Sequence, residues 1–336
     1  MSRVVPLFCP SRRALLKTGA ALAAASAAGA SAQAWPVAGR PIRLVLPSGA
    51  GGGADVFSRQ LAEWLGRELG TSVVVDNRPG ANGLLATQEV ARAAPDGHTL
   101  LVSFTAATVA NKLLMLAPPV DPIGSIVPIA RLGGGGGNMF VVHPSLPVRN
   151  LKELVELVRT RKDLSYASWG IGSGGHLVME SIKAQAGLSA LPHVPYKTVA
   201  QIPPDVISGV MPIAAMDSAT PIPHIRSGRM RAIATMSLER LPMLPDVPTM
   251  GEQGFRIDTI PWYGLFGPKG LPREVVDRVN ALANAWMVLP ETVAFVRDKQ
   301  NSPPYVPLTV AQFEKQIQDE LTSWKRLIDQ AGVKPE

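Results

Sequence analysis

The feature that most constrains this chain is an alternation of short apolar runs and amphipathic segments near its amino end. Residues 41–47 form a short apolar run closed by proline, which is typical of a buried strand. In residues 55–69, apolar side chains recur at four-residue steps and give one apolar helical face before a glycine. Strands are expected again at 72–76 and 99–103, with a helix at 83–94 between them. This order predicts a parallel sheet with right-handed crossovers.

The same alternation restarts further along the chain. A strand at 140–142 precedes a helix that Asn150 caps, because Glu153 follows at capping-box spacing. A strand at 164–167 then leads into a second glycine-rich loop. Later elements are expected at 211–216, at 231–236, after Pro272 and after Thr309. Two α/β blocks that each carry a small-residue loop after a strand can bring those loops together across one cleft.

The first 34 residues have the composition of an export signal. Arg12 and Arg13 precede an uncharged, alanine-rich run at 18–30, which is too short and too weakly apolar for a convincing membrane span. Ala32-Gln33-Ala34 supplies a small-x-small cleavage site, so we expect export and cleavage near Ala34. The arginine pair with Leu-Leu-Lys behind it resembles a twin-arginine signal, with the general secretory route as the alternative.

Loss of this segment changes what the composition means. It contains four basic residues and no acidic one, so its removal lowers the formal net charge from +7 to +3. A nearly balanced charge gives little support to nucleic-acid binding. Cys9, the single cysteine, leaves with the segment, so the exported chain needs no disulfide.

The loop Gly49–Ala54 fits the dinucleotide-binding pattern G-x-G-x-x-A. It follows a strand and opens a helix, and Asp76 stands at the end of the next strand, where the ribose-binding acid is expected. The same physics serves any anion, because glycines let backbone amides approach closely and the helix amino end carries partial positive charge. A pyrophosphate, a carboxylate and a plain structural turn therefore all remain open.

Three other loops contain small or hydroxyl residues. Residues 170–176 repeat the anion-binding composition, although His176 on its own is more often a packed or capping residue than a ligand. Residues 103–108 end a strand with three hydroxyls, which either bind an anion or cap a helix. The pentaglycine at 133–137 is interpreted as a loop rather than a hinge.

Recognisable catalytic patterns are missing from the sequence. The five histidines show no metal-ligand spacing, and no G-x-S-x-G elbow is present. No nucleophilic cysteine survives export. We therefore expect no enzyme activity, no metal and no cofactor.

Several sequence blocks together resemble one known family along essentially the whole exported chain. The most specific are Asp76-Asn77-Arg78-Pro79-Gly80-Ala81 and, later, Leu244-Pro245-Asp246-Val247-Pro248-Thr249. They resemble the Bug family, the periplasmic binding components of tripartite tricarboxylate transporters.

The resemblance implies a two-lobe periplasmic binding protein of type II, the Venus-flytrap fold, with a mostly parallel sheet flanked by helices in each lobe. It implies a first lobe at 35–138 plus 253–336 and a second lobe at 139–252, joined by crossing strands. The bound carboxylate would be held by backbone amides, hydroxyls and water. The site residues implied are Ser48, Gly49, Ala50, Gly51, Gly52, Ser103, Thr105, Ala106, Gly172, Ser173, Gly174, His176, Lys197 and Asp217.

Departures from the family bear on the ligand. Gly174 and Gly175 stand where serine or threonine is usual, so the pocket is expected to accept a different or less polar acid. Pro203 and Pro204 are expected to interrupt a helix. The leading hypothesis is a monomeric periplasmic protein that binds a di- or tricarboxylate, an aromatic acid or an acidic amino acid for a membrane permease or a sensor kinase. The alternative is an exported NAD(P)-binding oxidoreductase built on Gly49–Ala54.

Overall fold

The computed structural model describes residues 35–133, 138–237, 239–257, 259, 261–300, 302 and 305–335. The chain divides into two compact units, Met1–Ala38 and Gly39–Glu336, and the second unit contains all the helices and strands discussed below. The expected export signal at 1–34 lies outside the described residues, as do positions 134–137 of the expected glycine loop.

The first sheet carries the strand–helix alternation expected from the amino-terminal part of the chain. Its order is β2-β1-β3-β10-β4, in which β1 pairs in parallel with β2 and β3, and β10 runs antiparallel to β3 and β4. Four of its five strands therefore point the same way. The strands are β1 (Ile42–Leu46), β2 (Val73–Asn77), β3 (Thr99–Phe104), β4 (Ile126–Leu132) and β10 (Tyr263–Pro268).

The second sheet has the same plan, with the order β7-β6-β8-β5-β9. Strand β6 pairs in parallel with β7 and β8, while β5 runs antiparallel to β8 and β9. Both sheets are thus mostly parallel, with one strand reversed. The strands are β5 (Asn138–Val142), β6 (Tyr166–Ser168), β7 (His193–Pro195), β8 (Ile213–Asp217) and β9 (Arg231–Thr235).

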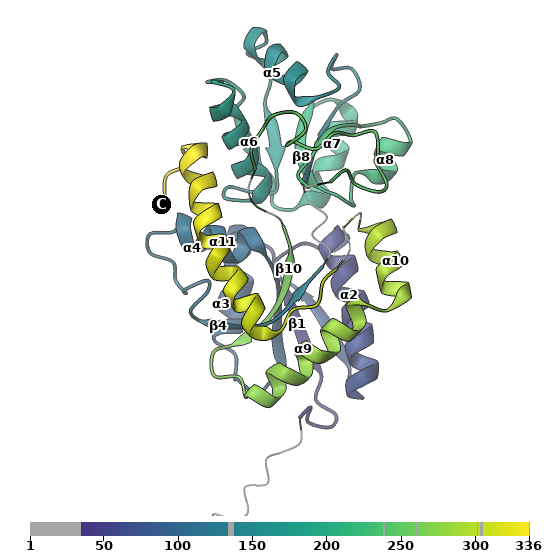
Figure 1. The fold of residues 1–336 in the computed structure, drawn as a ribbon, viewed down its shortest axis with the longest axis vertical. Coiled ribbons are helices and arrows are strands. Elements are labelled where there is room, and N and C mark those ends of the chain that lie inside the picture. Colours follow the sequence, from purple (N-terminus) through teal and green to yellow (C-terminus); the bar gives the residue numbers. More distant parts are fainter. Residues whose placement is uncertain are drawn as a thin grey trace, which may run out of the picture. The chain divides into compact units, whose positions relative to one another are not determined.

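We call each sheet with its flanking helices a lobe, the first built on β1 and the second on β5 (Figure 1). Strand β10 belongs to the first sheet although it follows the second lobe in sequence, so the chain crosses between the lobes twice. The first lobe carries α2 (Gly53–Leu69), α3 (Leu84–Ala91), α4 (Asn111–Leu114), α9 (Arg273–Met287), α10 (Pro290–Lys299) and α11 (Val310–Ala331). The second carries α5 (Leu151–Thr160), α6 (Gly174–Gln185), α7 (Ile202–Ser208) and α8 (Ile222–Arg226). The lobe boundaries inferred from sequence stay a prediction.

Local signals placed several helix ends correctly. The Asn150 side chain accepts the Glu153 N–H at 2.9 Å, and Thr309 forms a complete capping box with Gln312. The expected interruption at Pro203 and Pro204 is wrong. Both prolines lie in the first turn of α7, where no intrahelical N–H bond is lost, so they start the helix.

The long C-terminal helix α11 links the two lobes. It packs on β4 and α4 in the first lobe and on α6 in the second (Figure 1). Its buried stripe includes Phe313, Ile317 and Ile328, and it joins one apolar cluster that also contains Val45 of the first sheet and Phe140 of the second. Each lobe therefore shares part of its core with the other.

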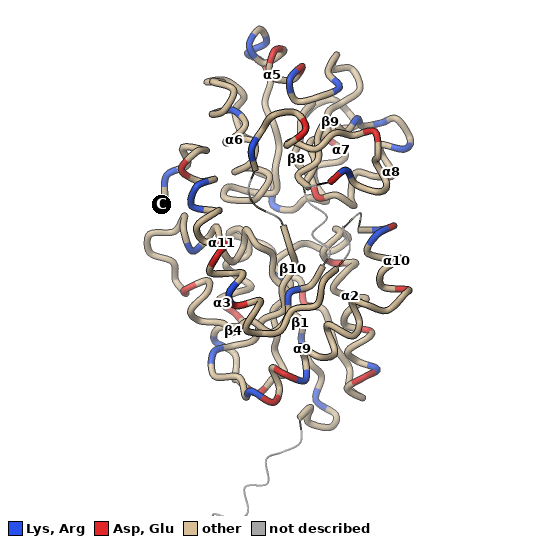
Figure 2. The backbone as a smooth tube through the Cα atoms, viewed as in Figure 1, with Lys and Arg blue, Asp and Glu red and all other residues tan. Residues whose placement is uncertain are grey.

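Charged side chains of both signs alternate along the outer helices of both lobes (Figure 2). Among the described residues no single helix is long and apolar enough to cross a membrane. The pair α9 and α10 meets that test only when taken together, across a 70° bend.

Candidate functional site

A cavity of about 810 Å³ lies between the lobes. It is lined by the loops that follow β1 and β3 in the first lobe and β6 in the second, and by the end of β8. These are carboxyl ends of parallel strands, where open α/β sheets bind ligands. The position and size of the cavity make it the candidate binding site.

The loop before α2 presents backbone amides to this cavity. The N-cap of α2 is Gly52, which is extended and has no side chain to accept a hydrogen bond, so the amides of the first helical turn are left for another acceptor. Gly52, Gly53 and Ala54 all line the cavity. The positive end of the helix dipole adds to their affinity for an anion.

The Asp55 side chain fixes the conformation of this loop through hydrogen bonds. Its buried carboxylate accepts hydrogen bonds from the Gly51 N–H at 3.0 Å, from Asn77 Nδ2 at 2.9 Å and from Nε and Nη2 of Arg59. Burial alone raises the pKa of Asp55, but the hydrogen bonds from Arg59, Gly51 and Asn77 outweigh burial and lower the pKa. Asn77 also donates to the Ser48 carbonyl at 3.0 Å, so the loop conformation is set before any ligand arrives.

Glycine is needed in this loop for two different reasons. Gly51 has φ +84° and does not line the cavity, and a Cβ there would meet nothing within 4 Å, so it is needed for its backbone conformation. Gly49 and Gly53 are needed for close approach. A Cβ at Gly49 would lie 2.7 Å from Thr198 Cγ2, and one at Gly53 would lie 3.2 Å from Asp217 Oδ1.

These contacts join opposite lobes, and two hydrogen bonds do the same. Asn82 Nδ2 donates to the Gly172 carbonyl at 3.0 Å, and Ser218 Oγ donates to the Gln300 carbonyl at 2.9 Å. The lobes are therefore in contact around the cavity, as in a closed flytrap.

Few charged groups face the cavity. Lys197 is exposed at its edge, and among the described residues it forms no ion pair. The Asp217 carboxylate is occupied by the N–H groups of Ala219 and Thr220, at 2.8 and 2.7 Å, and by the Thr220 hydroxyl. Lys334 also lines the cavity, is exposed and forms no ion pair among the described residues, so these two lysines are the side chains that can attract an anion.

Two tyrosines line the cavity in different ways. The Tyr196 hydroxyl donates to Asp205 of α7, and burial followed by that hydrogen bond raises the pKa of Tyr196 to about 12. Burial and then the charge of Asp217 raise the pKa of Tyr263, so this hydroxyl stays protonated and can donate to a ligand.

The glycine-rich loop of the second lobe is supported by a buried polar network. Gly172 and Gly174 line the cavity, but Ser173 and His176 do not. Ser173 Oγ accepts the His176 N–H at 3.3 Å and so caps α6, and it contacts Ser168 Oγ at 3.0 Å. His176 Nδ1 accepts the Gly172 N–H at 3.2 Å, and burial lowers the pKa of His176. Both side chains therefore position the loop.

His193 completes this network. Its ring lies 4.3 Å from that of His176, and its Nε2 lies 2.7 Å from Ser168 Oγ. Burial, followed by the charges of His176 and Lys183, lowers the pKa of His193 to about 3. The stacked imidazoles are thus neutral at neutral pH.

In the loop after β3, as in the glycine-rich loop, some residues line the cavity and others do not. Thr105 and Ala106 line the cavity, and Thr105 Oγ1 accepts the Trp262 N–H at 2.9 Å. Ser103 does not reach the cavity, because its hydroxyl is paired with that of Thr108 at 3.0 Å. Of the other residues implied by the resemblance, Ser48, Gly49, Gly52, Lys197 and Asp217 line the cavity and Ala50 and Gly51 do not.

The structure adds residues that sequence reasoning missed. Asn82 directly follows the recognised block at 76–81, so that block was a signal that this turn matters. Trp169, Trp262 and Tyr263 bring aromatic rings to the cavity from two distant segments, and Gln300 reaches it after α10. These positions share no sequence spacing that would have predicted a common site.

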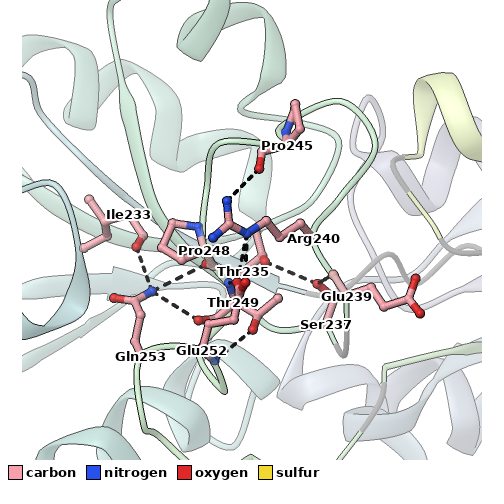
Figure 3. Close-up of polar contacts among 10 residues, drawn as sticks. All are labelled: Ile233, Thr235, Ser237, Glu239, Arg240, Pro245, Pro248, Thr249, Glu252 and Gln253. Carbon is pink, nitrogen blue, oxygen red and sulfur yellow. Dashed lines mark hydrogen bonds and ion pairs between the residues drawn. The ribbon is translucent and has the colours of Figure 1, made fainter.

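The segment that leads out of the second lobe is fastened to it by polar contacts (Figure 3). Arg240 Nε donates to both Glu252 oxygens at 3.0 Å, and Thr249 and Glu252 exchange backbone-to-side-chain hydrogen bonds. Gln253 donates to the Ile233 carbonyl at 3.1 Å. A smaller cavity of about 430 Å³ beside this segment is lined by residues between Met236 and Thr259 only, so it lacks the loops of the first lobe.

The dinucleotide interpretation of the Gly49–Ala54 loop is wrong on this geometry. Asp76, the expected ribose-binding acid, is paired with Arg43 and Arg78 and does not line the cavity. The hydrogen bond from Arg43, opposed by burial and helped by Arg78, lowers the pKa of Asp76.

Comparisons with known proteins agree with this geometry. Residues 57–333 match the family described as Tripartite tricarboxylate transporter family receptor. The chain is 33% identical over 312 residues to Protein BugT of Bordetella pertussis, covering 92% of this chain and 94% of BugT. Rpa4515 of R. palustris, solved with adipate, superposes with a TM-score of 0.84 at 28% identity, covering 90% of this chain and all of that one. MatC of Rhodopseudomonas palustris, solved with bound malate, gives 0.79 at 25% identity, with 87% and 99% covered.

Proposed function

Because the chain belongs to the tripartite tricarboxylate transporter family receptors, which are periplasmic binding proteins and not enzymes, we propose that it captures a small organic carboxylate in the cavity between its lobes. The observation that carries this proposal is that two groups that favour an anion, one from each lobe, line the same cavity. The uncapped amides of α2 come from the first lobe and Lys197 comes from the second. Both favour a negatively charged group.

Capture is a shift between open and closed lobes. A ligand that touches both loops binds the closed arrangement more tightly, so its binding energy stabilises closure. The cross-lobe bond from Asn82 to Gly172 forms at the same time. The solved relatives with adipate and malate support a carboxylate as the chemical class.

The setting follows from the amino end and from the family. The export-signal composition of residues 1–34 supports a periplasmic protein cleaved near Ala34. We propose that it works as a monomer. The closed form would then deliver its ligand to a membrane permease of a tripartite tricarboxylate transporter, or to a sensor kinase. No role in nucleic-acid binding is proposed.

A thermal-shift screen of the full-length chain tests the proposal. Its panel holds mono-, di- and tricarboxylates, aromatic acids, acidic amino acids, NAD and NADP. A ligand present at 100 times its dissociation constant stabilises the folded protein by about 2.7 kcal/mol, which is several degrees of melting temperature. Stabilisation by a carboxylate supports the proposal. Stabilisation by NAD or NADP alone, or by no acid in the panel, refutes it.

A further inference from the structure

The charge around the cavity is small. Its charged lining residues, among those the structure describes, are Lys197, Lys334 and Asp217, which gives a formal charge of +1. No arginine lines it in the same part of the chain. A ligand with two or three carboxylates would bring more negative charge than these side chains neutralise, and any carboxylate buried without a partner is costly. The charge therefore matches a single carboxylate.

Apolar side chains also line the cavity, together with the polar side chains of Asn82, Asn111 and Lys334. Leu114 and Met115 come from the first lobe, Ile171 from the second and Trp324 from α11. The lobes are in contact near Leu114, since a Cβ at Gly172 would lie 3.1 Å from Leu114 Cδ1. Contact with such walls favours hydrocarbon and penalises a carboxylate that finds no partner.

Aromatic rings also line the cavity. Trp169 directly follows β6, whereas Trp262 directly precedes β10 and Tyr263 is the first residue of β10, where the chain crosses back to the first lobe. The Trp262 ring is held by a 2.7 Å hydrogen bond from its Nε1 to Glu320 of α11. Rings contributed by both parts of the chain provide faces on which a flat ligand can stack.

The glycine pair at the start of α6 makes room for one of these rings. A Cβ on Gly175 would lie 2.6 Å from the Ala215 Cβ and 2.9 Å from Trp169 Cζ3. A Cβ on Gly174 would lie 2.8 Å from Asn138 Nδ2. A side chain at Gly175 would therefore displace the indole, so the absence of hydroxyls there and the presence of Trp169 in the cavity go together.

We infer that the ligand is a monocarboxylate with a bulky apolar or aromatic body, bound with its carboxylate at the α2 amides and Lys197 and its body between Trp169 and the crossing strand. This inference rests on the proposed function and narrows it. The cavity volume of about 810 Å³ falls within the range of about 300–1,000 Å³ typical of sites for ligands of drug size. Short, hydroxylated di- and tricarboxylates would fill little of it.

Isothermal titration calorimetry of the full-length chain with matched acids tests the inference. Hexanoate and adipate share a six-carbon chain and differ in one terminal group, and benzoate and terephthalate differ in the same way. We expect each monocarboxylate to bind at least about tenfold more tightly than its diacid partner. Equal or tighter binding of the diacids overturns the inference while leaving the proposed function intact. Binding of no carboxylate at all overturns both.

A pair of tryptophan variants tests the apolar wall separately. Trp169→Ala should weaken binding of 2-naphthoate by about tenfold or more, because the stacking face is lost. Trp64→Ala, on α2 and outside the cavity, is the matched control and should leave that affinity unchanged. Circular dichroism checks that both variants fold, and Trp169→Phe should restore most of the affinity. Unchanged affinity in a folded Trp169→Ala variant overturns the inference.

Discussion

Glu320 of α11 provides a test of how burial changes the protonation of a carboxyl group beside the cavity. Its Oε1 accepts hydrogen bonds from Trp262 Nε1 and Gln316 Nε2, both at 2.7 Å, while Oε2 is buried without a partner among the described residues. Burial raises the pKa of Glu320 from its ordinary 4.5 to about 7, against the hydrogen bonds from Gln316 and Trp262 and the charge of Arg131. A carboxyl group that supports a ring in the cavity is thus protonated below neutral pH.

The raised pKa makes the free energy of unfolding depend on pH. Below about pH 4.5 the group is protonated in both the folded and the unfolded chain, so the burial of charge costs nothing. Between pH 4.5 and about 7 the unfolded chain ionises while the folded chain keeps its proton, so stability falls as the pH rises, and the loss levels off once the folded chain also ionises above about pH 7. A pKa of about 7 against 4.5 corresponds to about 3 kcal/mol of lost stability, complete above pH 8.

Glu320→Gln removes the ionisation and keeps an oxygen that can accept the two hydrogen bonds. Any cost of the buried amide nitrogen is independent of pH, so the difference between pH 4.5 and pH 8.5 isolates the carboxyl group. We expect the variant to gain about 3 kcal/mol relative to the native chain between these two pH values. Urea unfolding at both pH values measures the effect.

Glu314→Gln, which changes an exposed glutamate on the same helix, is the control and should show no such gain. If Glu320→Gln changes stability by the same amount at both pH values, then Glu320 is not protonated by its environment. The argument from burial would then be refuted.

Two further predictions concern closure of the lobes. Gly49→Ala should lower ligand affinity by about tenfold, since its Cβ meets Thr198 Cγ2 across the cleft, and adding Thr198→Ser should restore binding by removing that methyl group. Titration calorimetry with the best acid from the screen decides this, and failure of the double variant to recover would contradict it. Asn82→Gly preserves the left-handed backbone (φ 46°) and removes the hydrogen bond to Gly172, so affinity should fall about fivefold. If Asn82→Gly binds normally while Asn82→Ala does not, the backbone and not the bond is responsible.

Much of the fold was predictable because its signals are local. Apolar periodicity located β1, α2 and α11, and the caps at Asn150 and Thr309 set where their helices begin. The two-lobe fold followed from repeated α/β units together with the recognised blocks. Strand β10 was not located, because a six-residue run that includes two glycines and a proline carries no periodicity that distinguishes it from a loop.

The candidate site was predictable at the level of loops and not of side chains. The sequence by itself determined that glycine-rich loops follow strands and open helices, since that pattern depends only on neighbours along the chain. Whether Ser173 and His176 face a ligand or support a loop depends on Ser168 and His193, which only the folded second lobe brings beside them. The aromatic character of the cavity likewise required the crossing of β10 and the docking of α11. Contacts between residues far apart in sequence are decided by tertiary packing, which leaves no periodic signal.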